Sequence, residues 1–271
     1  MKIVSKGRVL NSREFYERKI KRRKFFLVLL SIGAILFVSI LIYLARLERF
    51  LIKDVTVLGE DVVDKEEIRQ ITRETITGNY LWLIPRSNAM FYPGTAIERN
   101  LIKRFPRLKS VYLNVEKVQT LAVAVDERKP SALYCTLQCF FLDEEGLIFA
   151  EAPSFFGGTV YFTYTTKSPI ENPLGKKILN TDEFESLTKF IKNLIALAVV
   201  SSAIEIGEKE YSLVLSNGGK IIWRSDASLA LIRSNLEAFL SNESIKSQKD
   251  FLDRIELLDL RIENKVFYRF K

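Results

Sequence analysis

The sequence predicts an α+β protein with a single N-terminal transmembrane helix, a small domain of the order strand–helix–helix–strand–strand, and a mostly antiparallel β-domain with two helices. Three observations lead to this prediction: one long apolar run near the N-terminus, helical apolar spacing followed by alternating runs, and further alternating runs over the remainder. We expect four segments: a basic tail at 1–24, the membrane helix at 25–45, the small domain at 52–127 and the β-domain at 128–271.

The apolar run at 25–45 is 21 residues long and contains no charge. An α-helix rises about 1.5 Å per residue, so this run can cross a hydrocarbon core of about 30 Å. A secretory signal has a shorter apolar region, about 7–15 residues, and ends at a small-x-small cleavage site. The end of this run, Tyr43-Leu44-Ala45, lacks that site. We therefore expect an uncleaved anchor rather than a signal peptide or a buried core helix.

Charge is sorted along the chain. Residues 1–24 hold ten Lys and Arg against two Glu, a net charge of +8, and the whole chain also carries +8. Residues 25–271 are therefore neutral, with 31 charges of each sign. Short basic flanks stay on the cytoplasmic side, so we expect a cytoplasmic N-terminus and an extracytoplasmic bulk. A neutral outer part argues against nucleic acid as a partner, because such binding requires a basic patch.

The chain contains no histidine. This excludes Ser-His-Asp and Cys-His catalysis and histidine-based zinc sites. Lysine-based and paired-carboxylate catalysis stay open on composition, but no motif places such groups, and no phosphate-binding loop signature occurs. The acidic run 143–145 is interpreted as a solvated turn rather than a Ca²⁺ site. We expect no enzyme activity, cofactor, metal or small-molecule substrate.

The small domain opens with an alternating strand at 52–58. Asp64 is a good N-cap for the first helix, with Glu67 three residues later as its capping-box partner. Gly78 ends this helix.

A second helix is expected at 96–104. It ends before Pro106, because the residue preceding a proline is driven out of the helical conformation. Alternating runs at 108–115 and 121–125 then predict a hairpin. These elements complete the small domain.

In the β-domain, alternation and turn signals predict nine strands and apolar residues at helical spacing predict two helices. The strands are expected at 131–135, 139–143, 147–150, 159–165, 203–208, 210–216, 219–224, 254–261 and 265–270, and the helices at 182–198 and 227–241. The apolar stripes of both helices are interpreted as core rather than as cofactor contacts. Asn217-Gly218 is a strong tight-turn signal.

Cys135 and Cys139 flank three residues between two predicted strands. Residues that face each other across a hairpin have Cα atoms about 4.5–5.5 Å apart, which suits a disulfide. The expected compartment lies outside the cytoplasm, where disulfides persist. We expect a disulfide; the alternatives are two inert thiols or a redox pair, although this spacing is not the C-x-x-C redox motif.

Five short motifs run through the chain in a fixed order behind the membrane segment. They are Val55-Thr56-Val57-Leu58-Gly59, Phe105-Pro106-x-Leu108-x-x-Val111, Leu121-x-Val123-x-Val125-x-Glu127-Arg128-x-Pro130-x-Ala132, Leu142-Asp143-x-x-Gly146-x-x-Phe149, and Leu258-Asp259-Leu260-Arg261 followed by Val266-Phe267-Tyr268. Together with the predicted topology, they resemble the bacterial cell division proteins of the FtsQ/DivIB family. The third motif is the most specific match. By this resemblance the small domain is an FtsQ-type POTRA domain.

The resemblance implies a non-enzymatic, bitopic scaffold of the division complex at the septum, in the inner (cytoplasmic) membrane. It implies FtsB/FtsL (DivIC)-like division proteins as partners, and the septal peptidoglycan synthase complex as a further one. It also implies that part of the binding is strand addition at the last strand; an edge strand offers unpaired backbone groups for such pairing. We expect partner contacts from Arg261, Ile262, Phe267, Tyr268 and Phe270, with Val266 and Tyr268 on one face of the strand and Phe267 and Phe270 on the other.

Two other functions stay open. A POTRA-containing secretion or outer-membrane assembly component usually carries several such domains and a β-barrel, whereas this sequence predicts one domain and a helical anchor. A membrane-anchored cell-wall enzyme would need a pair of carboxylates that no motif places here.

Overall fold

A computed structural model of the chain describes residues 13–153, 160–248, 250–263 and 265–271. Residues 1–12, half of the predicted tail, lie outside the described residues, as does residue 159 at the start of one predicted strand. The chain forms two compact units, which are described separately. The first comprises the residues up to Leu58 with 64–98 and 112–124, and the second comprises 59–63, 99–111 and 125–271.

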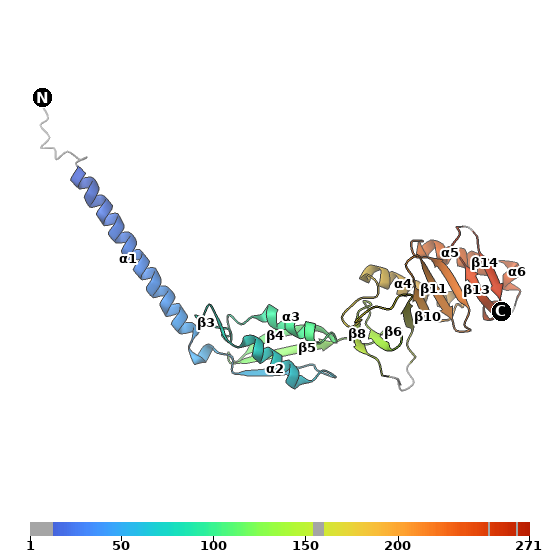
Figure 1. The fold of residues 1–271 in the computed structure, drawn as a ribbon, viewed down its shortest axis with the longest axis horizontal. Helices are drawn as coiled ribbons and strands as arrows, with labels where there is room; N and C mark the ends of the chain where they lie inside the picture. The colour runs from blue at the N-terminus through green and yellow to red at the C-terminus, as the bar shows by residue number, and fades with distance from the viewer. Residues whose placement is uncertain (1–12, 154–159, 249, 264) are drawn as a thin grey trace, which may run out of the picture. The chain divides into compact units, whose positions relative to one another are not determined.

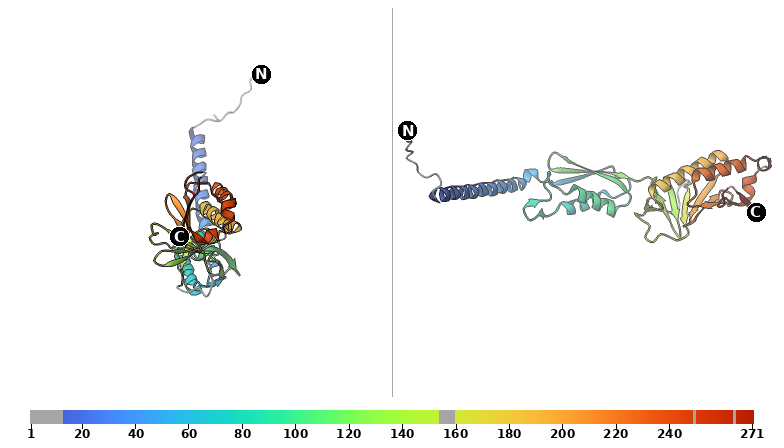
Figure 2. Two further views of the ribbon diagram at one scale, coloured as in Figure 1. Left: turned by 90° about the vertical axis from the view of Figure 1, so that its right-hand side faces the viewer. Right: turned by 90° about the horizontal axis from the view of Figure 1, so that it is seen from above.

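The helix α1 (Arg13–Ala45) is unbroken (Figure 1, Figure 2). Its segment Tyr16–Ala45 is 30 residues long, and the most apolar stretch has a mean hydropathy of 3.0 with none of it buried against the rest of the chain. By length and composition, this helix can span a membrane. The predicted anchor at 25–45 is its C-terminal part, and the basic residues at 18–24 continue the same helix.

The elements after α1 follow the predicted order of strand, helix, helix, strand, strand. They are β1 (Asp54–Leu58), α2 (Lys65–Ile76), α3 (Gly94–Arg104), β4 (Leu108–Glu116) and β5 (Thr120–Glu127), preceded by a short 3₁₀ turn at Glu48–Phe50. Their sheet has the order β1-β5-β4, with β1 parallel to β5. A short hairpin, β2 (Asn79–Tyr80) and β3 (Ile84–Pro85), lies between the two helices. The sequence does not predict it, because two-residue strands are too short to show alternation.

The local sequence explains where α2 begins and where β1 ends. The carboxylate of Asp64 accepts a hydrogen bond from the N–H of Glu66 (2.8 Å), so Asp64 caps α2 as predicted. Gly59 follows β1 with a φ of +84°, and a Cβ there would stand 2.3 Å from the carbonyl oxygen of Val125. Only glycine fits this position.

The second unit is built on a nine-stranded sheet in the order β14-β13-β12-β11-β10-β9-β6-β7-β8. The strands are β6 (Ala132–Cys135), β7 (Cys139–Leu142), β8 (Ile148–Glu151), β9 (Thr163–Thr166), β10 (Ser201–Ile206), β11 (Glu210–Leu215), β12 (Lys220–Arg224), β13 (Ile255–Asp259) and β14 (Phe267–Phe270). Each lies within a few residues of a predicted strand.

This sheet is mixed. Its hairpin neighbours are antiparallel, but β6–β9, β9–β10 and β12–β13 are parallel. Parallel neighbours need a crossover connection. The helices α4 (Thr181–Leu194) and α5 (Leu229–Leu240) supply it between β9 and β10 and between β12 and β13. The prediction of a mostly antiparallel β-domain therefore holds for the hairpins and not for the parallel neighbours.

The two crossover helices lie side by side (Figure 2) and share one core with the sheet. Phe184 and Leu187 of α4, Leu236 of α5 and Trp223 of β12 are all fully or almost fully buried there. These stripes are core, as predicted. Two short helices, α6 (Glu243–Lys246) and α7 (Phe251–Arg254), follow α5 and lead into β13.

The two ends of the large sheet differ. At β8, the N–H of Ile148 donates to the carbonyl of Lys176 (2.9 Å), and Ile148 accepts from the N–H of Gly175 (2.7 Å), so a loop covers part of that edge. At the other end, β14 pairs with β13, and no described strand lies beyond it. An uncovered edge of this kind is a template for pairing with another chain.

Candidate partner-binding edge

The strand β14 is the open edge of the large sheet, and all four of its residues are exposed. It pairs antiparallel with β13, so that Tyr268 lies opposite Leu258 and Arg269 opposite Leu257. This places three of the five predicted contact residues, Phe267, Tyr268 and Phe270, on one strand.

The direction of the backbone groups of β14 follows from one hydrogen bond. The N–H of Lys271 donates to the carbonyl of Arg254 (3.0 Å) and therefore faces β13. Successive residues of a strand direct their N–H and C=O groups to alternate sides. The backbone N–H and C=O groups of Arg269 therefore also face β13, whereas those of Tyr268 and Phe270 point away from the sheet. These outward groups could pair with an added strand.

A cluster of four rings supports β14 from one face; we call it the aromatic cluster and define it as Phe239, Phe251, Tyr268 and Phe270. The centroid of Phe251 lies 5.6 Å from that of Tyr268 and 5.4 Å from that of Phe270, and Phe239 lies 5.7 Å from Tyr268. Ring pairs at such distances add to the stabilisation from burial. The strand is thus held in place by side chains of α5 and α7.

The aromatic cluster corrects one prediction. Tyr268 and Phe270 share a face, with centroids 5.4 Å apart, as residues two apart in a strand must. The expectation that Phe270 shares a face with Phe267 is therefore wrong. Phe267 lies on the opposite face and is 51% exposed.

Polar contacts fix the strand further. The guanidinium of Arg254 lies 4.9 Å from the ring centroid of Phe270, a cation–π distance. The ammonium of Lys271 donates to the carbonyl of Asn217, whose own side-chain amide donates to the carbonyls of Leu252 (2.6 Å) and Asp253 (2.7 Å). The last residue of the chain is therefore tied to the turn before β12.

Arg269 and Glu256 form an ion pair beside β14, with nitrogen–oxygen distances of 2.8 and 2.9 Å. The hydrogen bond from Arg269 holds the pKa of Glu256 below its usual value. Both side chains are exposed, so this pair adds little stability.

Arg261 and Ile262 belong to the connection between β13 and β14. The guanidinium of Arg261 bonds both carboxylate oxygens of Asp259, the shortest at 2.7 Å, and one oxygen of Glu210 at 3.0 Å. The hydrogen bond from Arg261 lowers the pKa of Asp259. Ile262 is 51% exposed. Arg261 therefore already has partners within the chain, whereas Ile262 presents a free apolar side chain.

Sequence reasoning did not assign Phe239 and Phe251 to this edge. Phe239 is part of the apolar stripe predicted at 227–241, but a stripe does not reveal which strand it covers. Phe251 sits in a four-residue helix, which is too short to show periodicity. No signal in the sequence links these rings to β14.

The predicted cysteine pair lies elsewhere on the sheet, in the β6–β7 hairpin. Cys135 and Cys139 are paired residues in its register and are joined by a disulfide, with their Cα atoms 4.1 Å apart. Leu137, at the tip of the turn they close, is fully exposed. The structure does not bring this pair near the five predicted contact residues, since β6 and β7 lie at the β8 end of the strand order.

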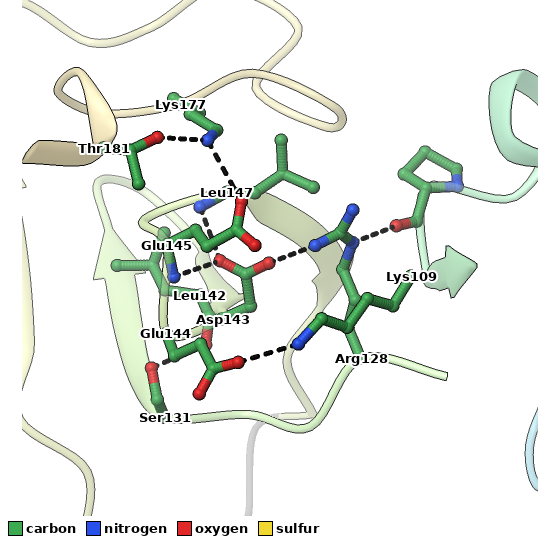
Figure 3. A network of polar contacts seen from close by, with 11 residues as sticks. Lys109, Arg128, Ser131, Leu142, Asp143, Glu144, Glu145, Leu147, Lys177 and Thr181 are labelled. Carbon is green, nitrogen blue, oxygen red and sulfur yellow. Dashed lines mark hydrogen bonds and ion pairs between the residues drawn. The ribbon is translucent and has the colours of Figure 1, made fainter. Parts of the chain in front are cut away.

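The acidic run 143–145 is engaged by cations and backbone groups (Figure 3). Asp143 is buried; it accepts from Arg128 and from the N–H groups of Glu145 and Leu147, both at 2.9 Å. Glu144 pairs with Lys109 (2.8 Å) and Glu145 with Lys177 (3.2 Å); these partners come from separate segments of the second unit. The interpretation of this run as a solvated turn is wrong for Asp143. Its carboxylate is buried and accepts hydrogen bonds from the backbone of the turn.

Glu127 and Arg128 of the most specific motif each have a different partner. One oxygen of Glu127 accepts from the N–H groups of Asp61, Val62 and Val63, each at 2.9 Å, and the other accepts from Arg107 at 2.9 Å. Arg128 pairs with Asp143. The motif is thus a structural junction within the second unit.

Comparison with models of known protein families and with curated proteins found no match to this chain. What the edge can do therefore follows from its own geometry and from the residues that form it.

Proposed function

We propose that this protein is a non-enzymatic, single-pass membrane scaffold of the FtsQ/DivIB kind, which binds FtsB/FtsL (DivIC)-like division proteins by strand addition at β14. The observation that supports this best is the open edge itself. Tyr268 and Phe270 direct their backbone groups outward, and the aromatic cluster holds the strand in place. A preorganised edge binds an extended segment at a lower entropic cost.

Other features support the same proposal. The basic residues at 18–24 precede the apolar part of α1, which favours a cytoplasmic N-terminus and an extracytoplasmic position for both units. The order strand, helix, helix, strand, strand with β1 parallel to β5 agrees with a POTRA-type domain. The membrane would then hold the edge near partners that also carry single helices.

The experiment compares Tyr268→Pro with Tyr268→Ala in the full-length protein in nanodiscs. Both variants remove the ring, but only proline also removes the outward N–H. We expect Tyr268→Pro to bind an FtsB- or DivIC-like partner at least about fivefold more weakly than Tyr268→Ala, because one backbone hydrogen bond contributes about 1 kcal/mol.

Binding is measured by titration of the purified partner, and the fold is checked from the fluorescence of the buried Trp223 in a Trp82→Phe background. Equal affinities of the two variants would refute strand addition at this edge. Partner binding that survives deletion of residues 265–271 would refute β14 as the site. Cleavage of purified peptidoglycan by the protein would refute a non-enzymatic role.

A further inference from the structure

The β2–β3 hairpin carries an unusually apolar tip, which we define as Leu81, Trp82 and Leu83. Leu81 is 85% exposed, Trp82 87% and Leu83 47%. Exposing two leucines and a tryptophan to water side by side at the tip of a turn is unfavourable in free energy. Exposed apolar groups that are contiguous mark a surface that contacts something other than water.

The tip is bound to the residue that follows α1. The guanidinium of Arg46 donates to the carbonyl of Leu83 through Nε (2.8 Å) and to the carbonyl of Trp82 through Nη2 (2.5 Å). The helix α1 ends at Ala45. The hairpin is therefore held beside the end of the membrane-spanning helix (Figure 1).

A second set of bonds fixes the segment after the hairpin at the same place. The side-chain amide of Asn88, which is buried, donates to the carbonyl of Ala45 (2.8 Å). The two residues that follow Ala89 are apolar and outward: Met90 is 77% exposed and Phe91 50%. More exposed apolar side chains thus adjoin the point where α1 ends.

We propose that the tip of the β2–β3 hairpin inserts into the interfacial layer of the bilayer that α1 spans, as a second membrane contact of the first unit. The last apolar residue of a spanning helix lies near the headgroups, so groups hydrogen-bonded to it lie at that depth. Tryptophan is enriched at this depth, because its ring is apolar and its N–H is polar. Apolar side chains beside cations such as Arg46 suit the headgroup boundary. This inference requires α1 to span a membrane and does not depend on the division scaffold.

The chain offers a direct test, because it has two tryptophans in opposite environments. Trp82 is 87% exposed, and Trp223 is fully buried in the core of the second unit. The full-length protein is reconstituted in vesicles of lipids brominated near the headgroup, and tryptophan fluorescence is compared with that in unbrominated vesicles. We expect the bromines to quench the Trp82 emission and to leave the Trp223 emission intact.

The variant Trp82→Phe identifies the source of the signal. In this variant, the quenching is expected to disappear, since only Trp223 emits. A wild-type protein whose Trp82 is quenched by iodide in the aqueous phase and not by brominated lipid would overturn the proposal. That outcome would leave water or a protein partner as the environment of the tip.

A second variant tests insertion by charge. Leu81→Asp places a carboxylate at the proposed depth and should reduce the quenching of Trp82, because a charge resists transfer from water. Leu137→Asp is the matched control: Leu137 is a fully exposed leucine at another turn, and its replacement should leave the quenching unchanged. Equal quenching in Leu81→Asp and the wild type would also overturn the proposal.

Discussion

Single carboxylates fix the local structure where the β5 strand ends. Glu127 is largely buried and binds three successive backbone N–H groups as well as Arg107. Burial acts to raise the pKa of Glu127, but the hydrogen bonds from Val63, Asp61, Val62 and Arg107 outweigh it, so its pKa lies below the usual 4.5. The charged form is therefore the one that the fold requires.

We predict that Glu127→Gln lowers the free energy of unfolding by about 2 kcal/mol at pH 7, because a charge-assisted contact is lost and the amide nitrogen meets Arg107. A carboxylate with a lowered folded pKa stabilises the protein above its unfolded pKa and loses this effect as the pH falls through the folded value. The difference between variant and wild type should therefore shrink below about pH 4.5.

The measurement is urea unfolding in detergent in a Trp82→Phe background, followed by Trp223 fluorescence at pH 7 and at acid pH. Glu144→Gln is the control. Its side chain is 72% exposed and pairs with an exposed lysine, so we expect its replacement to leave the stability nearly unchanged. A Glu127→Gln deficit of the same size at both pH values would contradict the linkage.

At the scale of elements, two hairpin turns place bulky residues in a left-handed backbone conformation that such residues disfavour. Leu81 and Trp82 have φ of +46° and +61°, and Lys117 and Val118 in the β4–β5 turn have +49° and +63°. Asn-Gly is the sequence that such consecutive left-handed positions favour. Bulky residues there are costly, so both turns can be improved for stability.

We predict that the double variant Leu81→Asn/Trp82→Gly raises the stability of the first unit by about 1–2 kcal/mol, because it relieves the backbone strain. Thermal unfolding by circular dichroism is the measurement. Lys117→Asn/Val118→Gly is the matched control and should stabilise by a similar amount. The two variants should differ in membrane contact, which only the first would lose. A lower melting temperature for both would contradict the strain argument.

The β6–β7 hairpin supports a separate prediction. We expect Cys135 and Cys139 to be disulfide-bonded in protein prepared without reductant, since they are register partners in the hairpin. Alkylation of the denatured protein should then add no label before reduction and two labels afterwards, as read by mass spectrometry. Equal masses with and without reductant would contradict the disulfide.

At the scale of the whole molecule, the sequence predicts elements better than their pairing. The helices α4 and α5 follow from apolar spacing, and the hairpins follow from alternation and turns such as Asn217-Gly218. The parallel neighbours β12 and β13 do not follow, because the helices α5, α6 and α7 lie between them in the sequence, and pairing across such a distance leaves no local signal. The aromatic cluster is missed for the same reason: Phe251 meets β14 only once the chain has folded.

In a single-pass membrane protein, which we propose this chain to be, charge controls the orientation of the whole chain in the membrane. Six Lys and Arg lie at 18–24, directly before the apolar part of α1. We predict that replacing these six by Gln reduces the fraction of molecules with an extracytoplasmic C-terminus, because basic residues near a membrane helix hold their side in the cytoplasm. A phosphatase that is active only outside the cytoplasm, fused after Lys271, reports that fraction. Replacing six exposed Lys and Arg of residues 125–271 is the control and should leave the reporter active, because charges in a long translocated domain carry little weight in orientation. An unchanged reporter in the tail variant would show that the basic cluster does not set the orientation.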